Sequence, residues 1–280
     1  MQQLPTIATL ELFPILHEKL ITLLRSLSAE DWHRPTVCKD WSVKDIASHL
    51  LDGNLRRITL YRDQYQSPEK PDIRSYRDLV DYLNQLNNSW VRATRRFSPR
   101  IITDLLEQTG EEVNELFNAL PPNEPAIFSV AWAGQDTSPN WFHIAREYTE
   151  NWHHQQQIRL AVDQPDGIMT AELYYPLLDT FMRALPHTYR EIPAEDGTLL
   201  QVSVTGEGGG NWYLYRQQQA WQLLYNPPFQ HPSDQVTIDG KIAWRLFTKG
   251  ISREAALPYV SIDGNRPLGE HVLSMLSVMA

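Results

Sequence analysis

The chain has 280 residues, of which 42% are hydrophobic and 21% charged, so two folded domains are expected and intrinsic disorder is not. A formal net charge of -9 argues against nucleic acid as a partner, because proteins that bind it usually present a basic face. One cysteine, Cys38, excludes an intramolecular disulfide. The N-terminal residues lack the basic region and apolar run that a signal peptide has, and no run approaches the roughly 18 apolar residues of a membrane span. We therefore expect a cytoplasmic location and no membrane partner.

The first part of the chain is predicted to be helical. Leucines at three- and four-residue spacing indicate a helix over about 9–27. A second helix begins at Ser42, because Ser42 and Asp45 stand in capping-box positions, with Trp41 and Ile46 placed for a hydrophobic staple. Further helices are predicted over about 76–97, 100–119, 140–163 and 170–185.

The pattern changes after Pro186. Residues 199–205 alternate between apolar and polar, a glycine turn follows at 208–210, and two further strands are indicated by WYLYR and AWQLLY. A short strand at 234–238 leads into a helix near 240–248, and YVSIDG leads in the same way into a last amphipathic helix over about 267–279. We therefore predict a helical domain over residues 1–186 and a smaller α+β domain over residues 187–280.

Four potential metal ligands share one face of the helix predicted at 140–163. At 100° per residue, His143, Glu147, Glu150 and His154 fall within an arc of about 60°. A solvated polar face would give the same pattern, although this arc contains no lysine or arginine.

Helix geometry limits which of these side chains can share an ion. His143 and His154 are separated by about 16 Å along the axis, whereas an i,i+4 pair is separated by only about 6 Å. The workable pairs are His143/Glu147 and Glu150/His154, and either would need a third ligand from elsewhere, since catalytic zinc usually has three protein ligands.

His49 is the best candidate for that third ligand. It lies at the edge of an apolar stripe formed by Val43, Ile46, Ala47, Leu50 and Ile58. Gly53, one turn later on the same face, leaves space beside it. A histidine packed into the core would occupy such a position equally well.

Two short segments resemble a known family. CKDWSVKDIASHLLD and ENWHHQQQIRLAVDQP are similar to the N-terminal domain of mycothiol-dependent maleylpyruvate isomerases, which belong to the wider DinB-like family of four-helix bundles. The family pattern is Cys-x-x-Trp before a metal-binding histidine, and then Glu-x-x-x-His on a later helix. The matching residues are Cys38, Trp41, His49, Glu150 and His154, and the resemblance covers about residues 9–165.

The second domain resembles the sterol-carrier-like domain that often follows in this family, in the segments VTIDGKIAWRLFTKG and VSIDGNRPLGEHVLSML. Family members carry a Gly-Arg pair after a Trp-containing helix, and its arginine is thought to help hold the thiol. This chain has Thr248-Lys249-Gly250 there, with Arg245 one turn earlier. Arg245 and Lys249 are therefore the cofactor-binding candidates, expected to hold a carboxylate of the thiol or substrate.

The resemblance implies a metal site of His49, Glu150 and His154 in a DinB-like four-helix bundle. Two imidazoles and one carboxylate suit Zn²⁺, with Ni²⁺ as the alternative. The implied enzyme uses a low-molecular-weight thiol, of the mycothiol, bacillithiol or glutathione type, in isomerase or S-transferase chemistry on a small electrophilic substrate. A metal-bound thiol is deprotonated near neutral pH, which makes it a nucleophile.

Two other functions stay open. In a metal-dependent hydrolase, bound water would replace the thiol and Glu147 would act as the base. Glu147 and His143 are accordingly the candidate catalytic residues. In a non-enzymatic protein, the metal would be structural and the second domain would bind a small molecule or lipid. The sequence leaves a homodimer open.

Overall fold

A computed structural model of the chain describes residues 4–68, 71–227, 229 and 231–278. These residues form two compact units. The helical unit consists of residues 9–121 and 150–168, and the sheet unit of residues 4–8, 122–149 and 169–278. The division into packed units does not test whether residues 1–186 and 187–280 fold independently. The predicted domain boundary near residue 187 therefore stays a prediction.

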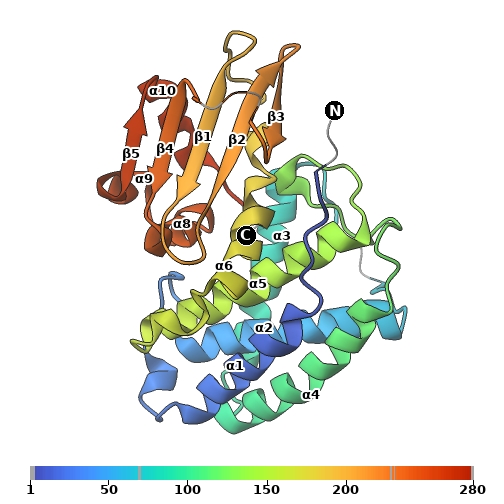
Figure 1. Ribbon diagram of the computed structural model, residues 1–280. Coiled ribbons are helices and arrows are strands. Elements are labelled where there is room, and N and C mark those ends of the chain that lie inside the picture. The colour runs from blue at the N-terminus through green and yellow to red at the C-terminus, as the bar shows by residue number, and fades with distance from the viewer. Residues whose placement is uncertain (1–3, 69–70, 228, 230, 279–280) are drawn as a thin grey trace. The chain divides into compact units, whose positions relative to one another are not determined.

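The helical unit is formed by long helices that lie side by side (Figure 1). Its apolar core joins Leu20, Ile46, Leu106 and Ile158, each from a different helix. The helices are α1 (Leu12–Ser26), α2 (Val43–Arg57), which continues as a π-helical turn over Ile58–Arg62, α3 (Tyr76–Thr94), α4 (Pro99–Asn118) and the second half of α5 (Asn140–Ala161), with short 3₁₀ turns at Asp31–His33 and Pro165–Ile168.

The start of α2 is fixed by the predicted capping box. The Ser42 hydroxyl accepts a hydrogen bond from the Asp45 backbone N–H, and the Asp45 carboxylate accepts one in return from the Ser42 N–H. Val43, Ile46 and the other residues of the predicted apolar stripe are buried. The orientation of α2 about its axis is therefore determined, and with it the direction of His49.

The sheet unit contains one five-stranded sheet in the order β3-β2-β1-β4-β5. β1 pairs in parallel with β4, and the other neighbours are antiparallel. The strands are β1 (Leu199–Val204), β2 (Gly210–Gln217), β3 (Ala220–Leu224), β4 (Asp234–Ile238) and β5 (Val260–Asp263). The helices are the first half of α5, α6 (Ala171–Met182), α7 (Leu185–Thr188), α8 (Gly240–Phe247), α9 (Arg253–Ala256) and α10 (Arg266–Glu270), with 3₁₀ turns at Ala131–Ala133, Leu257–Tyr259 and His271–Ser274.

The last predicted helix, over 267–279, is wrong in length. The α-helix ends at Glu270, continues as a 3₁₀ turn to Ser274 and becomes extended at Met275. Met275 and Val278 are buried, and the Ser277 N–H donates to the Phe247 carbonyl. The apolar residues whose spacing predicted a helix are therefore buried, but the segment that carries them is extended. Residue 279 lies outside the described residues.

The predicted class, a helical N-terminal part followed by a small domain with a sheet, is confirmed at this level. None of the described helices is both long and apolar enough to span a membrane.

Candidate metal centre

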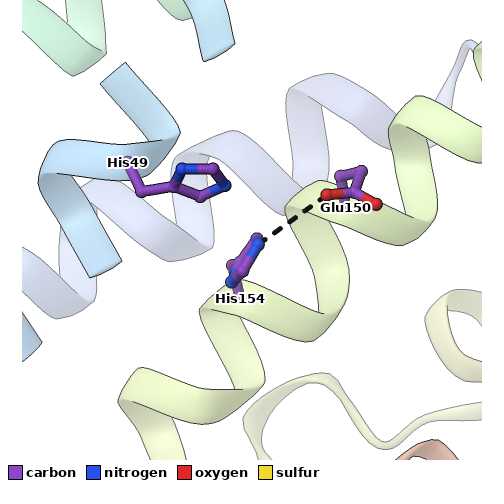
Figure 2. Close-up of side chains that lie close together, drawn as sticks. All are labelled: His49, Glu150 and His154. Carbon is purple, nitrogen blue, oxygen red and sulfur yellow. Dashed lines mark ion pairs between the residues drawn. The ribbon is translucent and has the colours of Figure 1, made fainter. Parts of the chain in front are cut away.

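Three potential metal ligands converge within the helical unit. His49 on α2 faces Glu150 and His154 on α5 (Figure 2). One donor atom from each residue lies within 4.8 Å of the other two. Among the described residues, this is the only group of three or more His, Cys, Asp or Glu side chains close enough to share an ion.

His49 is held between aromatic side chains. Its ring centroid lies 5.1 Å from that of Trp41 and 4.7 Å from that of His154. Its Nδ1 is buried and has no hydrogen-bond partner among the described residues. Burial, reinforced by the charges of His154, Arg56, His153 and Arg57, holds the pKa of His49 well below its usual value. The ring is therefore neutral near pH 7, the form that can bind a metal.

Glu150 and His154 form an i,i+4 pair on α5. Glu150 Oε2 and His154 Nε2 are 3.7 Å apart, too far for a hydrogen bond. On the other side of the ring, His154 Nδ1 lies 2.8 Å from the side-chain oxygen of Gln157. The ring of His153 lies beside that of His154, with centroids 4.0 Å apart.

The spacing of the donor atoms fits a divalent cation. Ligands bound to zinc at roughly 2.0–2.1 Å in a tetrahedral arrangement lie about 3.3 Å from one another. The separations here require an inward shift of about 1 Å or less to reach that geometry. The donor set, two imidazoles and one carboxylate, is one that zinc accepts.

His143 and Glu147, the other predicted pair, belong to the sheet unit and are not part of this group. Both are buried, with 3.8 Å between His143 Nε2 and Glu147 Oε1. Glu147 Oε1 also accepts a hydrogen bond of 2.7 Å from Arg146. The carboxylate of Glu147 is thus already paired with a cation, and a solvated polar face is excluded for both residues.

The three ligand candidates lie in a segment that matches a known protein family. A model of the mycothiol maleylpyruvate isomerase N-terminal domain matches residues 13–159, more than half of the chain and inclusive of all three ligand candidates. The chain belongs to this family.

Solved structures of the mycothiol-dependent maleylpyruvate isomerase are similar to this one. A crystal structure of a histidine-to-alanine mutant superposes with a TM-score of 0.51 at 10% identity, over 93% of each chain. A second crystal structure of the isomerase has a TM-score of 0.48 at 11% identity, over 87% of this chain and 88% of that one. At such low identity, the first likeness shows a shared fold. The chain matches no protein of curated function.

The cationic candidates taken from the mycothiol maleylpyruvate isomerase resemblance lie at the end of α8 in the sheet unit. Arg245 donates a long hydrogen bond of 3.4 Å to the Gly250 carbonyl, and its Nε is buried without a partner among the described residues. Lys249 is exposed and has a left-handed backbone, with φ of 62°. Their role in holding a carboxylate stays a prediction.

Sequence reasoning missed the residues that surround His154. From the sequence, His153 is expected to cap the helix or to face solvent, and Gln155 to Gln157 are expected at the surface. The expected exposure is wrong, because all four side chains are buried. The reason is that this part of α5 is enclosed on every face. The available signal is the absence of charge between Glu150 and Arg159, since a solvated helix face of that length usually carries charged residues.

Proposed function

We propose that the protein is a metal-dependent enzyme that uses a low-molecular-weight thiol, of the mycothiol, bacillithiol or glutathione type, in isomerase or S-transferase chemistry on a small electrophilic substrate. The proposal rests on one observation: donor atoms of His49, Glu150 and His154 lie within 4.8 Å of one another inside a family-matched segment. Zinc is the favoured ion, with nickel as the alternative.

Each residue of the proposed centre has a distinct part. His49 is held neutral by burial and contributes a lone pair without charge. Glu150 contributes the negative charge, and His154 the second neutral nitrogen. A bound divalent ion would lower the pKa of a thiol held at its open position and so favour the nucleophilic thiolate.

The interaction of Glu147 with Arg146 favours a thiol-using enzyme over a hydrolase. A hydrolase would need this carboxylate as the base for water, yet Glu147 already accepts a short hydrogen bond from Arg146, and a cationic donor weakens a carboxylate as a base. The assignment of His143 and Glu147 as catalytic residues stays a prediction, based on the ability of imidazole and carboxylate groups to transfer protons.

We also propose that the helical unit is a four-helix bundle of the DinB-like type and the sheet unit sterol-carrier-like. The bundle is supported by the apolar cluster that α1, α2, α4 and the second half of α5 share. The second assignment is supported by the passage from β4 directly into α8 at Asp239 and Gly240. A cytoplasmic location and a homodimer stay predictions.

The proposal is tested on the full-length protein loaded with Zn²⁺ or Ni²⁺. Small conjugated enones and enediones are incubated with mycothiol, bacillithiol or glutathione, and both isomerisation and thioether formation are followed by absorbance and mass spectrometry. We expect turnover that requires metal and one of the thiols and that is lost in His154→Ala. Turnover that does not require any of the thiols would contradict the proposed role of the thiol. A metal with four protein ligands and no turnover would favour the structural role.

A further inference from the structure

Gln157 makes a buried polar contact with His154, one of the proposed metal ligands. It follows His154 by three residues on α5, so the two side chains lie on the same side of the helix. Its Oε1 is 2.8 Å from His154 Nδ1. Gln157 is 4% exposed and His154 is 8% exposed, so water does not replace this contact at low cost.

The orientation of the Gln157 amide indicates where the hydrogen of the His154 ring lies, because the amide oxygen faces Nδ1. An amide oxygen only accepts hydrogen bonds, so Nδ1 must carry the hydrogen and donate it. In the neutral imidazole, Nε2 then has a lone pair and no hydrogen. That lone pair faces Glu150 Oε2 at 3.7 Å, which brings two acceptors together where a cation would bind both.

We propose that Gln157 is a positioning residue of the metal centre, which holds His154 in the Nδ1–H tautomer and in the ring orientation that presents Nε2 to the ion. This inference rests on the proposed metal site. Residues that accept the second N–H of a ligating histidine orient the ring and increase metal affinity, and their loss typically weakens binding about 10- to 100-fold.

The neighbouring glutamine provides a matched control. Gln156 is 1% exposed and donates through Nε2 to the Pro165 carbonyl at 2.7 Å. It therefore resembles Gln157 in size, burial and sequence position, but it bonds to a backbone carbonyl rather than to a proposed metal ligand. Replacing Gln156 measures the cost of losing a buried amide in this part of α5.

The first test is the tautomer of His154 in the metal-free wild type. Long-range ¹H–¹⁵N NMR of the assigned His154 ring distinguishes the two nitrogens. We expect hydrogen on Nδ1 and a bare Nε2. In Gln157→Leu the hydrogen is no longer held, and we expect the Nε2–H form to increase. Hydrogen on Nε2 in the wild type would overturn the proposal without any metal being present.

The second test is Zn²⁺ affinity, measured by competition with a chromophoric chelator. We expect Gln157→Leu to bind zinc about 10- to 100-fold more weakly, Gln157→Glu, which keeps an acceptor oxygen, to retain wild-type affinity or bind more tightly, and Gln156→Leu to remain close to wild type. Gln157→Met replaces Gln157→Leu if the latter does not fold.

Equal zinc affinity in the wild type and in a folded Gln157→Leu or Gln157→Met protein would overturn the role of Gln157. Equal loss in Gln156→Leu and Gln157→Leu would overturn it as well, because the effect would then be one of helix packing. A wild type that binds no zinc would instead refute the proposed function, and the NMR measurement would still decide the tautomer.

Discussion

The imidazole of His49 lies edge-on to that of His154, with ring centroids 4.7 Å apart and planes inclined by 70°. The two residues come from α2 and α5, which are far apart in the sequence. The capping box at Ser42 and the buried stripe of α2 fix the first ring. Gln157 and His153 restrict the second. The separation of the rings is therefore set by the packing of the core and does not require an ion to bring them together.

Trp41 is expected to stabilise the fold without taking part in chemistry. It is half-buried against the apolar cluster of the helical unit and lies beside His49. Trp41→Ala should lower the free energy of unfolding by about 3 kcal/mol, the low end for truncating a tryptophan because its ring is not fully enclosed. Thermal unfolding measures the change. Trp90→Ala is the control for removing a tryptophan from this core, since Trp90 packs against the same apolar cluster and donates a hydrogen bond to the Ser48 carbonyl. An unchanged melting temperature with activity abolished would make Trp41 a pocket residue.

The sequence was sufficient for elements whose signals are local. The start of α2 follows from Ser42 and Asp45. Helical spacing leaves two pairs on α5, of which the family resemblance selects Glu150/His154. The sequence was not sufficient where the burial of a residue depends on tertiary packing. Gln157 is as polar as a surface glutamine, and only the enclosure of α5 makes it a partner of His154. Similarly, Met275 and Val278 have the spacing of a helix face, but they lie on an extended segment whose apolar side chains are buried. Helical periodicity and tertiary burial produce the same apolar spacing there.

Asp179 is expected to be the most sensitive polar residue of the sheet unit. Its buried carboxylate accepts hydrogen bonds from Trp212 Nε1 and the Tyr225 hydroxyl and lies 3.6 Å from the Arg183 guanidinium. Asp179→Ala should cost about 3–5 kcal/mol, because it removes the carboxylate that balances the charge of the buried Arg183 side chain. Urea unfolding gives the value. Asp179→Asn, which keeps one acceptor oxygen, should cost less than Asp179→Ala, and a loss below about 1 kcal/mol in Asp179→Ala would show that the network contributes little.

His17 is expected to make stability depend on pH. Burial lowers the pKa of His17, against opposing effects of the Glu107 carbonyl and the charges of Glu111 and Glu107. In the unfolded chain its pKa is about 6.5. Between that value and the lower folded pKa, the unfolded state binds more protons, so stability is complete above about pH 6.5 and is lost as the pH falls through this window.

The effect of His17 is measured as the free energy of unfolding in urea at pH 7.5 and pH 5.5. The wild type should lose more stability over this interval than His17→Asn, which has no titrating group at this position. Equal losses in the two proteins would mean that His17 does not contribute to the pH dependence.

The central claim, that His49, Glu150 and His154 bind one divalent ion, is tested most directly by metal content. The full-length wild type, His49→Ala and His154→Ala are loaded with Zn²⁺ and passed through a desalting column. Their zinc content is then measured by inductively coupled plasma mass spectrometry. His143→Ala, from the other i,i+4 pair on α5, is the control. We predict about one ion per chain in the wild type and in His143→Ala, and little metal in the other two variants. Stoichiometric metal retained in both His49→Ala and His154→Ala would contradict the site.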